Sequence, residues 1–391
     1  MARLPDPSSL VLLALSGGVD SSVSALLLKE QGWRVEGLFM VNWEETEGYC
    51  TSATDFQDAR RVAEQLDLPL HRVHFSEMYR ERVFEPFLEA YAAGLTPNPD
   101  VSCNREIKFG VLWNYAQRLG ATHLATGHYA MIRESPQGLR LLRARDRHKD
   151  QTYFLNQVDR ETLSHCLFPI GQMTKPEVRA LARRRGLPTH AKKDSTGICF
   201  IGERPFRPWL QNFLPVNPGL ILDESGHILG EHSGTEFYNL GQRRGLGIGG
   251  VRGAREGSWY VYEKDHEANI LRVTQNLHHP ALWPGTIRLA GFHWIGPVPP
   301  SGQIRGLGKT RYLQPDAPCE MNWHPDRPPV IQFDHPVFAP TPGQYFVLYD
   351  GEICLGGGAI TEIGWDPLPA DRSIGPVRLT HRSADPISMT D

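Results

Sequence analysis

Short apolar runs alternate with longer amphipathic stretches from the start of the chain to about residue 130. This alternation is typical of βαβ units, in which apolar strands are buried between helices that cover a parallel sheet. The first part of the chain is therefore predicted to be an α/β, doubly wound parallel-sheet domain. The expected strands are Val11–Leu15, Val35–Val41, His71–Phe75 and His123–Thr126, and the expected helices are Ser21–Gln31, Asp55–Leu66, Glu77–Ala93 and about Val101–Leu119.

The pattern changes at about residue 208, where prolines and glycines interrupt short β-branched or aromatic runs such as Ser258–Tyr262. This texture predicts a small irregular module. Beyond about residue 279, turn residues recur between runs such as Val330–Phe333, Tyr345–Tyr349 and Glu352–Leu355. Such short, closely spaced strands favour a compact β-barrel or sandwich.

Three domains are therefore expected, because 391 residues are too many for one ordinary core. We place them at 1–207, 208–278 and 279–391. The tail after Trp365 is rich in proline and arginine and is expected to be loosely ordered.

The formal net charge of −3 gives the whole molecule no attraction for nucleic acid, so an RNA partner would have to bind local basic patches. Two stretches are basic enough, although the simpler interpretation of either one alone is a solvated charged face. The first contains Arg133, Arg140, Arg143, Arg145, Arg147 and Lys149. The second contains Lys175, Arg179, Arg183, Arg184, Arg185, Lys192 and Lys193.

No apolar segment approaches the ~20 residues that span a bilayer, and no convincing signal cleavage region precedes the first glycines. We therefore expect a cytoplasmic protein. Its six cysteines are scattered and include no CxxC pair. In a reducing compartment this spacing argues against a disulfide scaffold and a zinc ribbon, so no bound structural metal is expected.

The sequence LALSGGVDSS, residues 13–22, places two glycines between a predicted strand and a predicted helix. A strand that runs into a helix through Ser16-Gly17-Gly18 points backbone N–H groups and the positive end of the helix dipole at one spot, which suits an oxyanion. The phosphate loop GxxxxGK[ST] would supply a lysine, but this loop has none, and the loop does not match GxGxxG either. The loop therefore predicts phosphate binding without requiring γ-phosphoryl transfer.

The sequence NPDVSCN, residues 98–104, precedes the helix expected at about Val101–Leu119 and puts Cys103 in or beside its first turn. There the helix dipole lowers the pKa of a thiol and favours the nucleophilic thiolate. Asp100 has two open interpretations. It could cap the helix, or act as a general acid or base on a substrate beside Cys103.

A second cysteine, Cys199, lies in DSTGICFIG, residues 194–202, with glycines on both sides. Such a segment of small residues is typical of a mobile loop with room for a sulfur adduct. A buried structural thiol is the alternative.

The motif SGGVDS resembles the SGGxDS signature of the PP-loop ATP pyrophosphatases. With NPDVSCN, GHYA, HKDQTYFL, DSTGICFIGER and GQRRGLGIGG in the same order, the chain closely resembles the bacterial tRNA-specific 2-thiouridylases, the MnmA or TrmU family. The resemblance continues through PGQYFVLYDGEICLGGG and stops at about residue 366. It implies a PP-loop catalytic domain, a central tRNA-contacting module and a C-terminal β-barrel.

The resemblance also implies that ATP is cleaved between its α- and β-phosphates, with Mg²⁺ bound to the nucleotide. Asp20 would lie close to the phosphates or their magnesium. The residues expected to hold ATP are Ala14, Leu15, Ser16, Gly17, Gly18, Val19, Asp20, Ser21, Ser22, Met40 and Gly127.

In the family, one cysteine carries a persulfide and another completes sulfur transfer to the wobble uridine of tRNA. By resemblance, Cys199 is the persulfide carrier, Cys103 the nucleophile and Asp100 a catalytic group, while Cys50, Cys166, Cys319 and Cys354 are bystanders. The residues expected to contact the tRNA are Asn98, Pro99, Asp100, His128, Lys149, Asp150, Gln151, Arg243, Arg244, Arg311, Tyr312 and Gln344.

The partners that the resemblance implies are the anticodon stem-loop of tRNA and a sulfur donor, either a cysteine desulfurase or a sulfur-relay carrier. One monomer per tRNA and no membrane are expected. Two other functions stay open at this point. The chain could be a PP-loop ligase or amidotransferase acting on a small metabolite, or a non-catalytic tRNA-binding protein with a nucleotide sensor loop.

Overall fold

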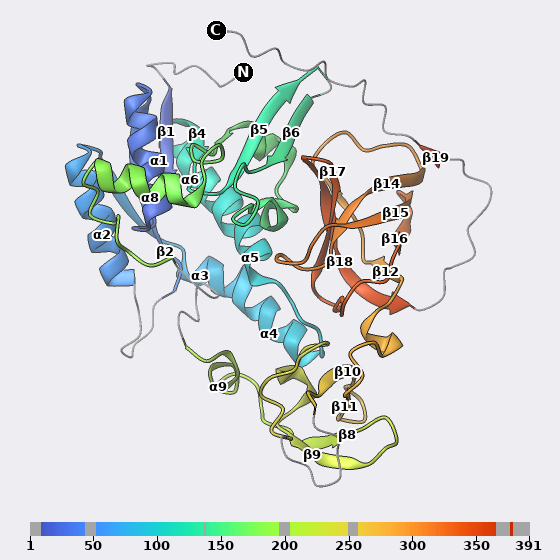
Figure 1. The fold of residues 1–391 in the computed structure, drawn as a ribbon. Coiled ribbons are helices and arrows are strands. Elements are labelled where there is room, and N and C mark those ends of the chain that lie inside the picture. The colour runs from blue at the N-terminus through green and yellow to red at the C-terminus, as the bar shows by residue number, and fades with distance from the viewer. Residues whose placement is uncertain are drawn as a thin grey trace.

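The computed structural model of the protein describes residues 9–43, 52–136, 138–194, 204–248 and 257–364, together with the backbone of 376–377. Figure 1 shows a parallel sheet flanked by helices, a small sheet formed by β8 to β11, and a β-barrel near the C-terminus. Within the described residues, no helix is long and apolar enough to cross a membrane.

The first sheet is entirely parallel, with the strand order β3-β2-β1-β4-β7. The four predicted strands lie within two residues of the observed ones, whereas β7 was not predicted. The bounds are β1 Leu10–Ala14, β2 Arg34–Val41, β3 Leu70–His74, β4 Ala121–Ala125 and β7 Cys166–Leu167.

Helices cover both faces of this sheet, as a doubly wound fold requires. Along β1, Val11 and Leu13 pack in one core while Leu10 and Leu12 pack in the other, because successive strand side chains point to opposite faces. The first core takes α1 Val19–Glu30, α2 Ser52–Gln65 and α8 Lys175–Arg184. The second takes α3 Ser76–Tyr79, α4 Glu85–Ala92, α5 Pro99–Ser102, α6 Leu112–Arg118 and α7 Arg160–Ser164.

Each of the two longest predicted helices contains a π-helical stretch that the sequence did not reveal. One is η1 Arg80–Phe84, between α3 and α4, and the other is η2 Cys103–Val111, between α5 and α6. A change to i→i+5 hydrogen bonds leaves the helix continuous, so apolar periodicity does not distinguish it. Gly120, with φ of +83°, ends the second helix.

A hairpin formed by β5 Ala130–Ser135 and β6 Gly138–Arg143 joins the first domain to the barrel. Strand β6 pairs with β18 through Leu141 and Leu142. Arg143, from the first basic stretch, is buried, donates to Asp316 at 2.9 Å, and lies 3.7 Å above the ring of Tyr349. This arginine therefore belongs to an internal contact and not to a solvated face.

The central module contains a four-stranded sheet in the order β10-β11-β8-β9. Its elements are α9 Phe206–Leu210, β8 Gly219–Leu222, β9 Ile228–His232, η4 Thr235–Phe237, β10 Tyr260–Asp265 and β11 Ile270–Thr274, followed by η5 Pro280–Leu282.

The C-terminal sheet is a closed barrel and not a sandwich. Strand β12 pairs with both β16 and β18, so the strands β12-β16-β15-β14-β17-β18 form a ring without exposed edges. Ile287, Met321 and Phe346 lie in its buried core. The strands are β12 Thr286–Leu289, β13 His293–Trp294, β14 Gly302–Lys309, β15 Ala317–His324, β16 Arg327–Phe333, β17 Tyr345–Asp350, β18 Ile353–Gly364 and β19 Pro376–Val377.

Candidate active site

The predicted phosphate loop lies between the end of β1 at Ala14 and the start of α1 at Val19. Gly17 has a φ of +76°, and a Cβ atom there would lie 2.2 Å from the carbonyl oxygen of Asp55, so this position requires glycine. The hydroxyls of Ser21 and Ser22 donate to the carbonyl oxygen of Gly18 at 3.1 and 2.7 Å. No side chain caps α1 at Gly18, so the helix presents the backbone amide groups that bind oxyanions.

A lysine from outside the loop reaches the only carboxylate within it. Lys175, the first residue of α8, donates to both carboxylate oxygens of Asp20 at 2.8 and 2.7 Å, and Tyr129 donates its hydroxyl to Oδ1 at 2.9 Å. Burial first, and then the charge of Asp20, raise the pKa of Tyr129, which keeps this phenol protonated. Lys175 is only 8% exposed. The loop therefore has a lysine partner that its own sequence does not contain.

Three cations surround a second carboxylate, that of Asp194. Lys175 lies 2.9 Å from its Oδ1, Lys149 lies 2.9 Å from its Oδ2, and Arg179 donates to Oδ1. Burial alone would raise the pKa of Asp194, but hydrogen bonds from Lys149 and Lys175 hold it well below its usual range. Asp194 is therefore ionised, and it lies beside the loop because it shares Lys175 with Asp20.

Part of the second basic stretch thus faces the phosphate loop. Lys192 also donates to the carbonyl oxygen of Gly17 at 3.0 Å, whereas Arg183 and Arg184 are exposed on the same helix as Lys175. The sequence did not reveal that Lys175, Arg179, Asp194 and Lys192 lie beside the loop. Lys175 and Arg179 are four residues apart, which places them on one face of a helix. This spacing is the signal that could have predicted these two residues.

The predicted adenosine contacts lie near the loop in different ways. A Cβ atom on Gly127 would lie 2.8 Å from the backbone nitrogen of Ser21, so this glycine allows its segment to pack directly against α1. Met40 is half-buried in the last part of β2, and it packs against the core on the η2 side of the sheet.

The residue after Gly127 connects the phosphate loop to the cysteine motif. His128 is buried, its Nδ1 lies 2.7 Å from the hydroxyl of Thr126, and its ring lies 5.7 Å from that of Phe109 in η2. Two consecutive residues therefore contact the start of α1 and the helix that begins at Cys103. This is the clearest link between the predicted nucleotide and cysteine sites.

The cysteine motif forms the first turns of a helix, as predicted. Cys103 is buried and follows α5 as the first residue of η2. The capping interpretation of Asp100 is wrong, because the Asn98 side chain is the cap and accepts from the backbone nitrogen of Val101 at 3.3 Å. Asp100 instead lies in the first helical turn. Pro99 is buried beside it.

Lys108, which was not predicted to lie at the site, is a charged neighbour of both Asp100 and His128. Burial raises the pKa of Asp100, and the positive charge of Lys108 opposes part of this rise. Burial also lowers the pKa of His128 well below its usual value, and Lys108 lowers it further. His128 is therefore neutral. Asp100, His128 and Lys108 share one neighbourhood beside the start of η2.

The three residues predicted to contact tRNA from HKDQ have internal partners. Asp150 is buried and accepts from the backbone nitrogen of Ala144 at 2.9 Å and from the hydroxyl of Thr152 at 2.8 Å. The side-chain oxygen of Gln151 accepts from the backbone nitrogen of Tyr129 at 2.9 Å. Only Lys149 extends toward the loop, where it pairs with Asp194. Their contacts with tRNA stay predictions.

The other predicted tRNA residues divide into exposed and internal groups. Arg243 and Arg244 are exposed in a glycine-rich turn of the central module. Arg311 donates to the carbonyl oxygens of Leu240 and Ala339 at 2.9 and 2.8 Å, which ties the barrel to that module. Tyr312 packs against Phe154, and Gln344 bonds to the 96–98 segment.

Cys199 and Cys50 lie outside the described residues, so the structure places neither. The remaining three cysteines, which were predicted to be bystanders, are all buried. Burial raises the pKa of Cys319 to about 12 and also raises that of Cys354, so both thiols stay protonated at neutral pH.

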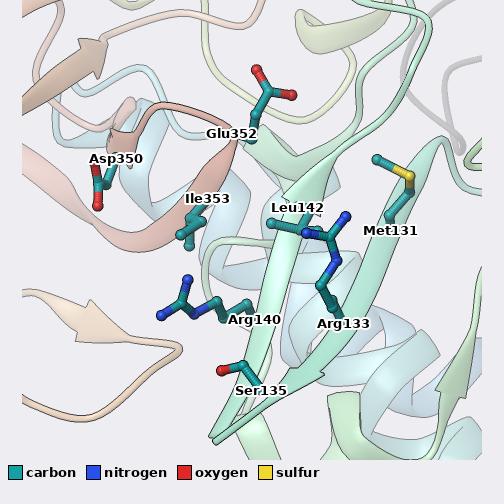
Figure 2. A pocket seen from close by; sticks show the side chains of 8 residues that line it. All are labelled: Met131, Arg133, Ser135, Arg140, Leu142, Asp350, Glu352 and Ile353. Atoms are coloured by element: carbon teal, nitrogen blue, oxygen red, sulfur yellow. The ribbon is translucent and has the colours of Figure 1, made fainter. Parts of the chain in front are cut away.

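Figure 2 shows a separate pocket of about 380 Å³ where the β5–β6 hairpin meets the β17–β18 turn. Arginine and acidic side chains share its wall, and none of the predicted nucleotide or tRNA residues lines it. The lining residues are Met131, Arg133, Ser135, Arg140, Leu142, Asp350, Glu352 and Ile353.

Comparison with known proteins identifies the family. Residues 9–203 match the model described as the tRNA methyl transferase HUP domain, 207–275 match its PRC-barrel domain, and 285–360 match an aminomethyltransferase beta-barrel domain. The chain is 51% identical over 356 residues to the tRNA-specific 2-thiouridylase MnmA of Nitrosomonas eutropha, covering 90% of this chain and 99% of the relative. The chain belongs to the tRNA-specific 2-thiouridylase MnmA family.

A second MnmA relative, from Dichelobacter nodosus, is also 51% identical, over 90% of this chain and 94% of its own length. Among solved structures, a 4-thiouridine synthetase–RNA complex with bound ATP aligns with 50% of this chain and 46% of its own, at 17% identity and a TM-score of 0.33. The sequence relatives alone confirm the family that the ordered motifs predicted.

Proposed function

We propose that this protein is an ATP-dependent tRNA 2-thiouridylase that replaces the C2 oxygen of the wobble uridine by sulfur, releasing AMP and pyrophosphate. The observation that carries the proposal is the pair Gly127 and His128. One packs on the phosphate loop and the other on the helix of Cys103. Nucleotide activation and thiol chemistry can therefore act on one substrate. Family membership favours this function over a small-metabolite ligase or a non-catalytic tRNA-binding protein.

The phosphate loop would bind ATP, with adenosine near Met40 and Gly127. The uridine C2 oxygen is a poor leaving group, so it attacks the α-phosphate and becomes part of AMP when pyrophosphate leaves. Proteins often bind Mg²⁺ through one carboxylate together with the phosphates of the substrate, and Asp20 would provide that carboxylate. Magnesium would neutralise phosphate charge there. Within the described part of the chain, no cluster of three or more His, Cys, Asp or Glu could hold a metal alone.

Sulfur transfer would then use the two predicted cysteines. The terminal sulfur of a persulfide on Cys199 bonds to C2, and the C2–O bond to AMP breaks. The thiolate of Cys103 attacks the Cys199 sulfur, so the sulfur–sulfur bond breaks, the transferred sulfur stays on C2, and a Cys103–Cys199 disulfide forms. A thiol reductant restores both cysteines. The raised pKa of Asp100 suits it to carry a proton in these steps.

The tRNA would present its wobble base unstacked and flipped out of the anticodon loop. Asn98, Pro99, Asp100 and His128 would surround this base. Arg243 and Arg244 are exposed in the central module, which supports a role in binding the tRNA backbone. Each of the three expected domains would have its own role in this reaction. The protein would be a cytoplasmic monomer that receives sulfur from a cysteine desulfurase or a relay carrier.

Mass spectrometry of tRNA nucleosides tests this function in cells that lack the gene. The wild-type chain should restore wobble 2-thiouridine, whereas Cys103→Ala and Cys199→Ala should not. Cys166→Ala is the matched control, because this buried thiol lies in β7 of the same domain and should be dispensable. Full restoration by either of the first two variants would exclude the two-cysteine mechanism.

A further inference from the structure

Three cations converge on the carboxylate of Asp194. Lys149, Lys175 and Arg179 all bind that carboxylate. The cations come from two separate segments, so the cluster depends on the fold and not on a local run of charge. Such a cluster of cations is able to bind a multiply charged anion such as a phosphate group.

This cluster of cations adjoins the phosphate loop. The same ammonium of Lys175 that lies 2.9 Å from Asp194 also binds both oxygens of Asp20, which is 155 residues away in the sequence and within the loop. The amide groups at the start of α1 and the cations of α8 therefore face a common space. In GxxxxGK[ST] loops, a lysine of the motif itself contacts the β- and γ-phosphates, and this loop has no such residue.

We infer that Lys175 and Arg179 bind the β- and γ-phosphates of ATP, and that Asp194 occupies the position of these phosphates in the nucleotide-free protein. The inference rests on the proposed function, because it takes ATP as the nucleotide. Phosphate oxygens replace the Asp194 carboxylate on the two cations when ATP binds. Lys175 and Arg179 then stabilise the negative charge that develops on departing pyrophosphate.

The local structure orients both cations for this role. Lys175 is held at the start of α8 by a capping box between Thr174 and Glu177, and its backbone nitrogen donates to Asp146 at 2.8 Å. The guanidinium of Arg179 also donates to the carbonyl oxygen of Lys192 at 2.9 Å. Its planar group can bind two phosphate oxygens at once.

Asp194 has a physical reason to be there without nucleotide. Lys175 is almost fully buried, and a buried cation without an adequate counter-charge is costly. Asp20 provides one counter-charge to Lys175, and Asp194 adds a second that also balances Lys149 and Arg179. This second carboxylate is exchanged for phosphate, so the cations are preorganised before ATP arrives. Replacing the carboxylate by a neutral amide should therefore strengthen phosphate binding.

Equilibrium binding of three probes to the full chain tests the inference. The probes are α,β-methylene ATP, inorganic pyrophosphate and AMP, which lacks the β- and γ-phosphates. Lys175→Met and Arg179→Met should each weaken binding of the first two by about tenfold or more and leave AMP binding within about twofold. Asp194→Asn should strengthen binding of the first two. Arg183→Ala, an exposed change on the same helix, is the matched control and should alter none of them.

Wild-type affinity for ATP in Lys175→Met and Arg179→Met, or equal weakening of ATP and AMP, would overturn the inference. Asp194→Asn keeps the test decisive if removal of a cation disturbs folding, since unchanged or weaker pyrophosphate binding in this variant also overturns it. If the wild type produces 2-thiouridine and binds ATP, and the variants bind all three probes as tightly as the wild type does, only this inference fails. A wild-type chain that neither binds ATP nor modifies tRNA would refute the proposed function as well.

Discussion

The side-chain amide of Asn98 donates to Oε1 of Gln344 at 3.4 Å, across 246 residues of sequence. Gln344 also donates to the carbonyl oxygen of Thr96 at 3.0 Å, and the backbone nitrogen of Thr96 donates to the carbonyl oxygen of Pro342 at 2.9 Å. The barrel thus holds the segment that caps the Cys103 helix. A change in the barrel should therefore affect chemistry at the cysteine site.

Gly343→Ala tests this connection. Gly343 has a φ of +93°, and a Cβ atom there would lie 2.7 Å from the backbone nitrogen of Thr96. The substitution should cost about 1–3 kcal/mol of unfolding free energy through backbone strain. It should also lower kcat for tRNA thiolation while the affinity for AMP is unchanged. Gly351→Ala is the control, because Gly351 also has a positive φ, of +54°, but its Cβ would have no atom within 4 Å. Equal thiolation by both variants would contradict the connection.

Asp20→Asn should abolish tRNA-dependent pyrophosphate release. The change removes the carboxylate that binds Lys175 and that would hold magnesium. Without magnesium, the negative charge of the phosphates is no longer neutralised. We expect a loss of about a hundredfold or more in the rate of pyrophosphate release. Asp159→Asn, an exposed change before α7, is the control. Continued release by Asp20→Asn would place the phosphate chemistry elsewhere.

The two halves of this site differ in how far the sequence could predict them. The phosphate loop and the cysteine helix are local, because glycine punctuation, alternating burial along β1 and the position of Cys103 depend on neighbouring residues. The cations of α8 and the contact between Asn98 and Gln344 are not local. They depend on packing between segments more than a hundred residues apart. Charge runs in sequence do not show which members point inward.

The first basic stretch shows the same limit. Arg143 and Asp150 looked like part of a surface for RNA, but both are buried. Arg143 lies at the end of β6 against Tyr349, and Asp150 accepts from Ala144 and Thr152. The three arginines of the β5–β6 hairpin look alike in the sequence, but Arg133 is exposed whereas Arg143 is buried. Only the tertiary contact with Asp316 reveals the internal role of Arg143.

Lys108→Met should shift to higher pH the part of the pH–rate profile of thiolation that reports the ionisation of Asp100. Burial raises the pKa of Asp100 and Lys108 lowers it in part, so removal of this positive charge raises the pKa further. If the protonated carboxyl is the active form, activity falls as pH rises through this pKa, and the falling limb moves to higher pH. Lys108→Arg should keep the limb in place because the charge is retained. A kcat profile that is the same in all three proteins would exclude this coupling.

Binding of ATP and binding of tRNA should favour each other through Lys149. In the nucleotide-free protein its ammonium pairs with Asp194 at 2.9 Å, and the sequence predicts that the same ammonium contacts tRNA. Displacement of Asp194 by phosphates would release Lys149 for an RNA phosphate. We therefore expect α,β-methylene ATP to tighten binding of an anticodon stem-loop by about fivefold or more. In Asp194→Asn, Lys149 is available from the start, so the RNA should bind tightly without nucleotide and the tightening should disappear.

Lys149→Met should also abolish the tightening, but here RNA should bind weakly both with and without nucleotide. This result distinguishes Lys149→Met from Asp194→Asn, which should bind RNA tightly in both conditions. Fluorescence anisotropy of a labelled stem-loop, measured at one salt concentration with and without nucleotide, gives all six affinities. Salt must be fixed because contacts between cations and RNA phosphates weaken as it rises. Tightening of the wild-type size in Asp194→Asn would show that the two sites communicate by another route, since that variant has no carboxylate to exchange.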